Sequence, residues 1–203
     1  RNLANDVDDN VVDALVEAVN GRNEDLSHRY YTLKAGWMGK KQIDWWDRNA
    51  PLPGDNDRQY SWTDAQEIVL DAFGGFDSDM AEIAKPFFDK NWIDAAPRAG
   101  KSSGAFSHPA VPSAHPYILM NFAGKSRDVM TLAHEMGHGI HQVLAAEQGY
   151  LMSDTPLTLA ETASVFAEML AFRRLVDNES DANVRRLLLA GKVEDMLNTV
   201  VRQ

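Results

Sequence analysis

Hydrophobic residues recur at every third or fourth position along most of the chain, and this spacing predicts helices rather than strands. A first helix is expected over 10–19, with Gly21 as its natural end. The aromatic-rich segment 27–39 indicates a second helix. A third helix is expected from a capping box of Thr63 and Gln66 to Gly74 and Gly75, and a fourth over 78–92, kinked or broken at Pro86. Further helices are expected over 127–148, over 156–176 and from 181 onward.

One stretch departs from this helical pattern. Residues 97–116 are rich in glycine and proline, and short strand-like pieces lie at 105–107 and 117–122. The second piece, Tyr-Ile-Leu-Met-Asn-Phe, is the stronger strand candidate. Residues 51–56 have the composition of a loop. The expected fold is therefore mainly α, with a small β-sheet just before the central helix.

Composition places the chain among soluble globular proteins and excludes several functions. Its 203 residues are 44% hydrophobic and 25% charged, which suits one domain with a sizeable core. There are no cysteines, so disulfides and thiolate chemistry are excluded. The net charge of −10 has the wrong sign for binding nucleic acid or an anionic membrane surface.

The apolar runs and the two ends of the chain indicate where the protein is located and whether the sequence is a fragment. No uncharged apolar run approaches the roughly 18 residues of a membrane span, and the acidic first residues do not resemble a signal peptide. The absence of cysteine and of a signal is compatible with a cytoplasmic enzyme. Because the chain begins at Arg1 and stops inside an expected helix, we expect 1–203 to be a single fragment of a larger domain.

The central helix carries the motif His134-Glu135-Met136-Gly137-His138. At about 100° per residue, His134 and His138 lie about 40° apart around the axis and one turn apart along it, so two imidazoles can bind one cation. Zinc is the metal expected for such a pair, at one ion per chain. Glu135 can reach a water molecule on the metal and act as the general base. The alternative is an exposed helix with two incidental histidines.

Two glycines lie within this helix, Gly137 and Gly139. Each costs about 1 kcal/mol relative to alanine in a helix interior. Such a cost suggests that a neighbouring backbone comes close to the helix, and we expect the strand at 117–122 to be that neighbour.

A catalytic zinc needs a third protein ligand. The metzincin pattern is excluded because His141 and Leu144 stand where it requires Gly and His. The downstream carboxylates are Glu147, Asp154, Glu161, Glu168 and Glu179. Glu147 lies too far along the helix of the two histidines to complete a tetrahedron with them.

The two carboxylates at 161 and 168 share one face of the helix at 156–176, which the preceding turn would fold back against the motif helix. We expect Glu161 to be the third ligand, with a capping-box role beside Thr158 as the alternative. Glu168, two turns further on, is expected to orient a histidine rather than to bind the metal.

The roles of three other histidines remain open. His141 shares the helix stripe of His134 and could compete as a ligand, but a role beside the site or in the core is favoured. His108 and His115 lie in the glycine- and proline-rich segment and could touch a substrate, although surface or turn roles are favoured for both.

The residues from His134 to Gln142, with Leu159-Ala160-Glu161-Thr162-Ala163-Ser164 and Glu168, resemble the thimet oligopeptidase and oligoendopeptidase F family of gluzincin-type zinc peptidases. Stretches similar to the oligoendopeptidase F branch also lie at 28–35, 46–53, 98–106 and 120–122. The last two hold Arg98-x-Gly-Lys-x-x-Gly-Ala-Phe106 and Met120-Asn121-Phe122.

That resemblance implies that His134, His138 and Glu161 bind zinc and that Glu135 is the general base. The family is largely helical, and the edge strand of its small sheet pairs with extended peptide. Here this strand would come from 104–108 or 117–121, so the substrate-contact candidates are Gly104, Ala105, Phe106, His108, Tyr117, Met120 and Asn121. Family members are longer, and the His and Tyr that help to stabilise the oxyanion would lie beyond residue 203.

The sequence therefore predicts a zinc-dependent endopeptidase that acts on oligopeptides, present here as the central part of its catalytic domain. The alternative is a catalytically incomplete or inactive family-like domain that serves as a peptide-binding module.

Overall fold

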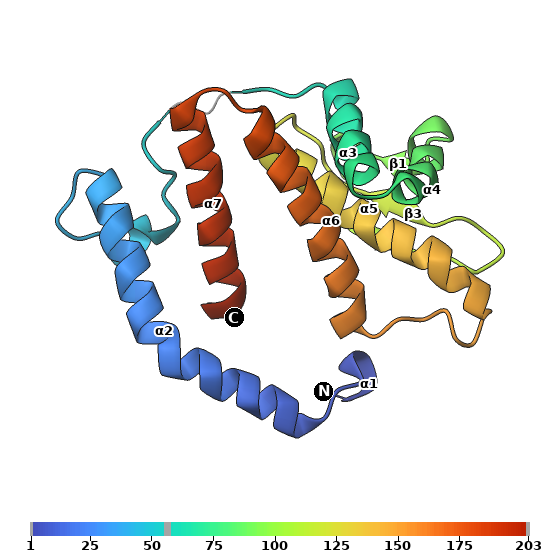
Figure 1. Ribbon diagram of the computed structural model, residues 1–203, viewed down its shortest axis with the longest axis horizontal. Helices are drawn as coiled ribbons and strands as arrows, with labels where there is room; N and C mark the ends of the chain where they lie inside the picture. The colour runs from blue at the N-terminus through green and yellow to red at the C-terminus, as the bar shows by residue number, and fades with distance from the viewer. Residues whose placement is uncertain (1, 55–57, 202–203) are drawn as a thin grey trace. The chain divides into compact units, whose positions relative to one another are not determined.

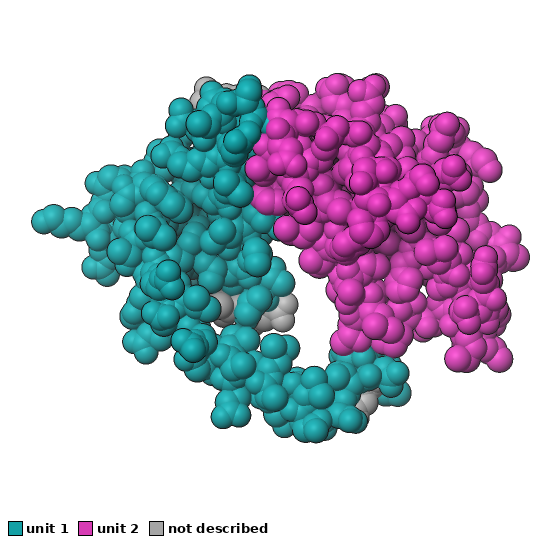
Figure 2. Space-filling model, viewed as in Figure 1, with its two compact units in different colours: residues 1–56, 179–203 teal, residues 57–178 magenta. Residues whose placement is uncertain are grey.

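The computed structural model describes residues 2–54 and 58–201, and the chain divides into two compact units (Figures 1 and 2). Unit 1 comprises residues 1–56 and 179–203, and unit 2 comprises residues 57–178. The expected fold class is confirmed, because long helices dominate the chain and its strands form one small three-stranded sheet. Among the helices of the described ranges, none has the length and hydropathy that crossing a bilayer requires.

Unit 1 is helical. It holds α1 (Asn2–Asn5), α2 (Asp9–Trp37), the 3₁₀ helix η1 (Trp45–Asn49) and α7 (Ala182–Val201). The expectation of two separate helices over 10–19 and 27–39 is wrong, because α2 runs through Gly21 without a break. One glycine costs a helix only about 1 kcal/mol, which a helix of this length absorbs. Residues 51–54 form the expected loop, whose last two predicted positions lie outside the described residues.

In its described residues, unit 2 contains the sheet, four α-helices and a 3₁₀ helix. Its elements are α3 (Trp62–Phe76), α4 (Ser78–Asp89), β1 (Ile93–Asp94), β2 (Phe106–His108), β3 (Tyr117–Leu119), α5 (Ser126–Ala145), η2 (Ala146–Gln148) and α6 (Leu157–Asn178). The capping box of α3 is formed by Ser61 and Asp64, not by the expected pair two residues later. Pro86 lies inside α4, which continues to Asp89 and does not break there.

In the sheet, β3 is the central strand, with the order β1-β3-β2. Strands β1 and β3 are parallel, whereas β2 and β3 are antiparallel with Ser107 opposite Ile118. The sequence pattern did not predict β1, which has only two residues and therefore no periodicity to detect. Because β3 is paired on both sides, only β1 and β2 have outer edges.

Helix α5 lies in the core of unit 2, and its two glycines explain how closely it packs. A Cβ at Gly137 would lie 2.8 Å from the Ala163 carbonyl oxygen and from Ser164 Cα, so the backbone of α6 is the close neighbour. At Gly139, a Cβ would lie 2.8 Å from the Phe87 ring and 3.5 Å from Ile118 Cδ1. The expectation that strand 117–122 supplies the close backbone is therefore wrong, because only one side chain of that strand reaches Gly139.

Candidate metal centre

Two histidines and a glutamate converge where α5 packs on α6. His134 and His138 are half-buried and lie one turn apart on α5, with their ring centroids 5.0 Å apart. Glu161 of α6 places Oε2 at 3.4 Å from His134 Nε2 and at 3.5 Å from His138 Nε2. One ligand atom from each of the three residues lies within 4.8 Å of the other two. The glycine at 137 makes this convergence possible, since a side chain there would separate the two helices.

The two distances from Glu161 Oε2 are those between neighbouring ligands of a tetrahedral zinc ion. Ligand atoms placed about 2.0–2.2 Å from zinc at tetrahedral angles are about 3.4 Å apart. Imidazole nitrogen and carboxylate oxygen are both common zinc ligands. The Glu161 side chain is 52% exposed, which leaves the donor set open to solvent on one side. Ser164 Oγ donates to Glu161 Oε2 over 2.8 Å and holds that carboxylate in place.

Glu168, two turns after Glu161 on α6, contacts the outer nitrogen of a histidine. Its Oε2 lies 3.0 Å from His134 Nδ1. This contact favours the tautomer with the proton on Nδ1, so that Nε2 keeps its lone pair on the side of Glu161. The hydrogen bond to Glu168 raises the pKa of His134, whereas burial lowers the pKa of His138.

Glu135 follows the first histidine and is buried, with 6% of its surface exposed. Burial raises the pKa of its carboxyl, and the nearby charge of Glu161 acts in the same direction. The neighbouring His134 and a hydrogen bond from the Ser107 backbone lower it again in part. A buried carboxyl with a raised pKa beside a set of metal ligands is suited to accept a proton.

Strand β2 is fastened to α5 at its middle residue, Ser107. Its carbonyl accepts a hydrogen bond from Gln142 Nε2 over 3.2 Å, and its Oγ donates to Gln142 Oε1 over 2.8 Å. Neither Ser107 nor Gln142 was predicted from the sequence to be part of the site. Gln142 lies one residue beyond His141 and seven beyond Glu135, and this two-turn spacing on one helix is the signal that could have indicated it.

The seven substrate-contact candidates fall into two groups. Gly104, Ala105, Phe106 and His108 lie on or beside the outer strand β2, and Phe106 is 49% exposed. His108 Nδ1 accepts a hydrogen bond from the Ala110 N–H. The other three lie on or after the central strand β3: Tyr117, which is exposed, Met120, which is fully buried, and Asn121, whose amide binds loop carbonyls.

The remaining histidines lie outside the donor set. His141 is half-buried near His138, but the cluster of ligand atoms found among the described residues does not include it. His115 stacks flat on Trp92 with their ring centroids 3.9 Å apart, and its Nδ1 lies 2.9 Å from the Pro116 carbonyl oxygen.

The chain belongs to peptidase family M3, whose family model matches residues 76–203. Among its curated relatives, the chromosomal oligoendopeptidase F of Lactococcus lactis subsp. cremoris is 31% identical over 202 residues. That match covers 99% of this chain and 33% of the relative. The oligopeptidase PepF of Bacillus subtilis (strain 168) is 30% identical over 200 residues, covering 98% of this chain and 30% of the relative. The expected resemblance to the oligoendopeptidase F branch is thereby confirmed.

Solved structures support the same fold. A crystal structure of a protein assigned as a peptidase from Chlamydophila abortus superposes with a TM-score of 0.79 at 25% identity, covering 95% of this chain and 32% of that one. PZ peptidase A with an inhibitor gives a TM-score of 0.77 at 17% identity, covering 95% and 34%. The chain thus spans about a third of the length of the relatives that it matches.

Proposed function

We propose that this chain is part of the catalytic domain of a zinc-dependent endopeptidase that hydrolyses oligopeptides. The observation that carries the proposal is the convergence of His134, His138 and Glu161 beside the buried carboxyl of Glu135. Membership of peptidase family M3 and similarity to proteins named oligoendopeptidase F favour peptide bonds as the target.

The three converging residues are the proposed zinc ligands, one ion to a chain. A bound zinc ion would act as a Lewis acid toward the scissile carbonyl and the attacking water. Glu168 fixes the ring of His134 by accepting a hydrogen bond from its Nδ1–H, and Ser164 fixes the carboxylate of Glu161 by donating to it. Both contacts reduce the freedom that the ligands would lose on binding metal.

Glu135 is the proposed general base. Its carboxylate takes a proton from the attacking water and then delivers it to the leaving amine. Burial raises its pKa toward the range in which a carboxyl both accepts and donates protons efficiently. A hydrogen bond from the Ser107 backbone of β2 lowers this pKa in part.

The outer edge of the 104–108 stretch is the proposed site for the peptide main chain, apart from Ser107, whose carbonyl on that edge already accepts from Gln142. Of the two stretches expected from the sequence, 117–121 contains the strand that is already paired on both sides, whereas 104–108 has an outer edge. A peptide added there gains main-chain hydrogen bonds that do not depend on its sequence, as in other cases of β-strand addition. Such binding suits an enzyme that accepts many oligopeptides.

The test is Glu135→Gln in the zinc-loaded full-length enzyme, with cleavage of a quenched fluorescent octapeptide as the readout. The variant should retain one zinc ion and lose activity by about 10³-fold, because glutamine cannot accept the proton. Glu147→Gln, which changes an exposed carboxylate just after α5, is the matched control and should leave the rate unchanged. Undiminished turnover by Glu135→Gln would refute the assigned base.

The metal assignment has its own test. Glu161→Ala should lower the zinc content well below one ion per chain, measured by elemental analysis after dialysis, because two histidines alone bind zinc weakly. If the parent enzyme binds zinc and peptide but does not cleave, the peptide-binding module is the better interpretation.

A further inference from the structure

The connection between β1 and β2 must cross the end of the strand that separates them. Because the order is β1-β3-β2, residues 95–105 pass from one outer strand to the other around the end of β3. The strands they join have only two and three residues. Such short strands contribute few hydrogen bonds, so the position of β2 depends on how this connection is held.

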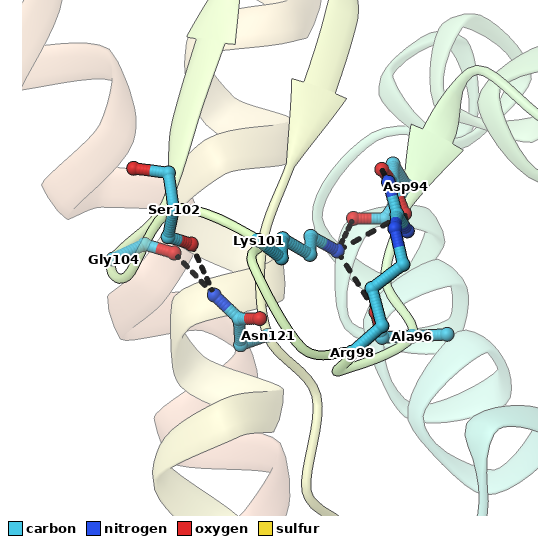
Figure 3. A network of polar contacts seen from close by, with 7 residues as sticks. All are labelled: Asp94, Ala96, Arg98, Lys101, Ser102, Gly104 and Asn121. Carbon is cyan, nitrogen blue, oxygen red and sulfur yellow. Dashed lines mark hydrogen bonds and ion pairs between the residues drawn. The ribbon is translucent and has the colours of Figure 1, made fainter.

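Lys101 anchors the connection to the end of β1 (Figure 3). Its side chain is 2% exposed, and its ammonium donates to the Asp94 carbonyl over 2.9 Å, to Asp94 Oδ1 over 3.0 Å and to the Ala96 carbonyl over 3.1 Å. An ammonium group has three hydrogens, so these partners satisfy all of them. The buried charge is therefore fully compensated in one defined geometry.

Asp94 is held from a second side. Arg98 donates from both terminal nitrogens to the two carboxylate oxygens, over 2.8 Å and 2.6 Å. The Asp94 carbonyl also accepts from the Met120 N–H over 3.0 Å, which ties the same residue to the end of β3. Together, Asp94, Arg98 and Lys101 form a cluster, here called the β1 clamp, that fixes the first half of the connection.

Asn121 fixes the second half. Its Nδ2 donates to the Ser102 carbonyl over 2.9 Å and to the Gly104 carbonyl over 3.2 Å (Figure 3). Gly104 has φ of +91°, a conformation that side-chain-bearing residues rarely adopt. With both amide hydrogens on the loop backbone, Asn121 sets the direction in which the chain enters β2 two residues later.

We propose that Lys101, with Asn121, positions the edge strand β2 for the peptide main chain. The link to the helix that carries the site is Ser107, whose carbonyl and hydroxyl are both held by Gln142 of α5. The clamp fixes the start of the strand, and these contacts fix its middle. Lys101 and Asn121 are thus positioning residues, and this inference rests on the proposed function.

The experiment compares Lys101→Met with Lys85→Met in the zinc-loaded full-length enzyme. Methionine keeps an unbranched side chain, one atom shorter than lysine, and removes every donor, while Lys85 is an exposed lysine on α4 of the same unit. Lys101→Met should raise KM for an octapeptide about tenfold and lower kcat less, because a displacement of about 1 Å weakens peptide alignment without removing the metal. Zinc content should stay at one per chain, and Lys85→Met should match the parent.

Hydrogen exchange gives a readout that does not need activity. In Lys101→Met the backbone amides of 104–108 should exchange faster than in the parent, while those of α5 stay as protected as before. If the parent enzyme cleaves no peptide, the proposed function fails, but faster exchange confined to 104–108 still supports the clamp. Unchanged exchange and unchanged KM would overturn the proposal.

A second variant covers the case in which Lys101→Met does not fold. Asn121→Asp keeps the size of the side chain but places acceptors against the Ser102 and Gly104 carbonyls, so it should also raise KM and speed exchange at 104–108. Loss of kcat at an unchanged KM, in either variant, would contradict a role in positioning the peptide.

Discussion

The α5–α6 pair of unit 2 and the α2–α7 pair of unit 1 both hold charged or ionisable side chains between two helices. In unit 1, Lys34 of α2 is fully buried, and its ammonium donates to Glu194 of α7 over 2.6 Å and to the Arg48 carbonyl over 2.7 Å. In unit 2, His134 and His138 are only half-buried, and the carboxylate they face is half-exposed.

The two helix pairs differ in whether their polar atoms can still bind a ligand. The ammonium of Lys34 is enclosed by protein acceptors, so this pair holds unit 1 together and presents nothing to a solute. On α5 and α6, one nitrogen of His134 is held by Glu168, and the other points to the Glu161 oxygen that His138 also faces. Convergence with access to solvent, rather than burial, is what distinguishes a ligand site from an internal ion pair.

The two pairs also differ in how closely their two helices pack. At Gly137 the backbone of α6 is so near that no Cβ fits. At Gly21 and Gly36 of α2 and at Gly191 of α7, no atom of the described residues lies within 4 Å of a built Cβ. Backbone contact therefore sets the distance between α5 and α6, whereas long side chains bridge α2 and α7.

The largest effect in this comparison is expected when the buried pair of unit 1 loses one partner. Glu194→Ala should lower the free energy of unfolding by about 3 kcal/mol, because it leaves an ammonium buried with a single carbonyl acceptor. Urea unfolding measures this. Replacing both partners, with Lys34→Met and Glu194→Leu together, should recover most of the lost free energy of unfolding. A Glu194→Ala protein as stable as the parent would show that the ion pair does not stabilise unit 1.

A smaller loss is expected from the close helix contact in unit 2. Gly137→Ala should cost about 2 kcal/mol, because the added methyl group pushes the backbone of α6 away. The same shift moves Glu161 from the histidines, so zinc should bind more weakly. The matched control is Gly21→Ala, in an open stretch of α2, which should raise stability by up to about 1 kcal/mol. If Gly137→Ala and Gly21→Ala had equal urea midpoints, α5 and α6 would not be packed more closely than the open stretch of α2.

The sequence could predict the helical fold and the donor set because both depend on local spacing. His134, Glu135 and His138 lie on one helix, where a separation of four residues fixes their relative direction. Glu161 and Glu168 lie on one face of the next helix for the same reason. A short connection folds that helix back, so the two patterns meet in space.

The parts that the sequence could not predict depend on contacts between distant segments. Strand β1 has two residues and exists because β3 pairs with it. Ser107 contacts Gln142 across 35 positions of sequence. The helix spacing that places Gln142 on the face of Glu135 does not identify this partner. The neighbour of Gly137 was wrongly expected to be a strand, because a tight glycine indicates that something is close but not which segment it is.

Glu168→Gln tests the outer contact of the metal site. Glutamine has nearly the same shape but no charge, so His134 is oriented less firmly and binds zinc about tenfold more weakly. Competition with a chelating indicator measures the affinity, and Glu82→Gln, on the exposed face of α4, is the control. Stability to urea without metal should hardly change, in contrast to Glu194→Ala. An unaltered zinc affinity would mean that Glu168 does not orient the His134 ring.

The smallest effect is expected at Asp94, because its carboxylate is half-exposed and its backbone carbonyl still accepts from the buried Lys101 when the side chain is changed. Arg98 and Lys101 hold the pKa of Asp94 well below its usual range, which in the unfolded chain is about 3.9. A depressed folded pKa means that the ionised carboxylate contributes stability above about pH 4 and that this contribution is lost as the pH falls further. Asp94→Asn should therefore be less stable than the parent at pH 7, by less than Glu194→Ala, since water screens a half-exposed pair. The difference in urea midpoint between parent and Asp94→Asn should shrink when the measurement is repeated at pH 3, and a difference that stays constant would show that the charge of Asp94 contributes nothing.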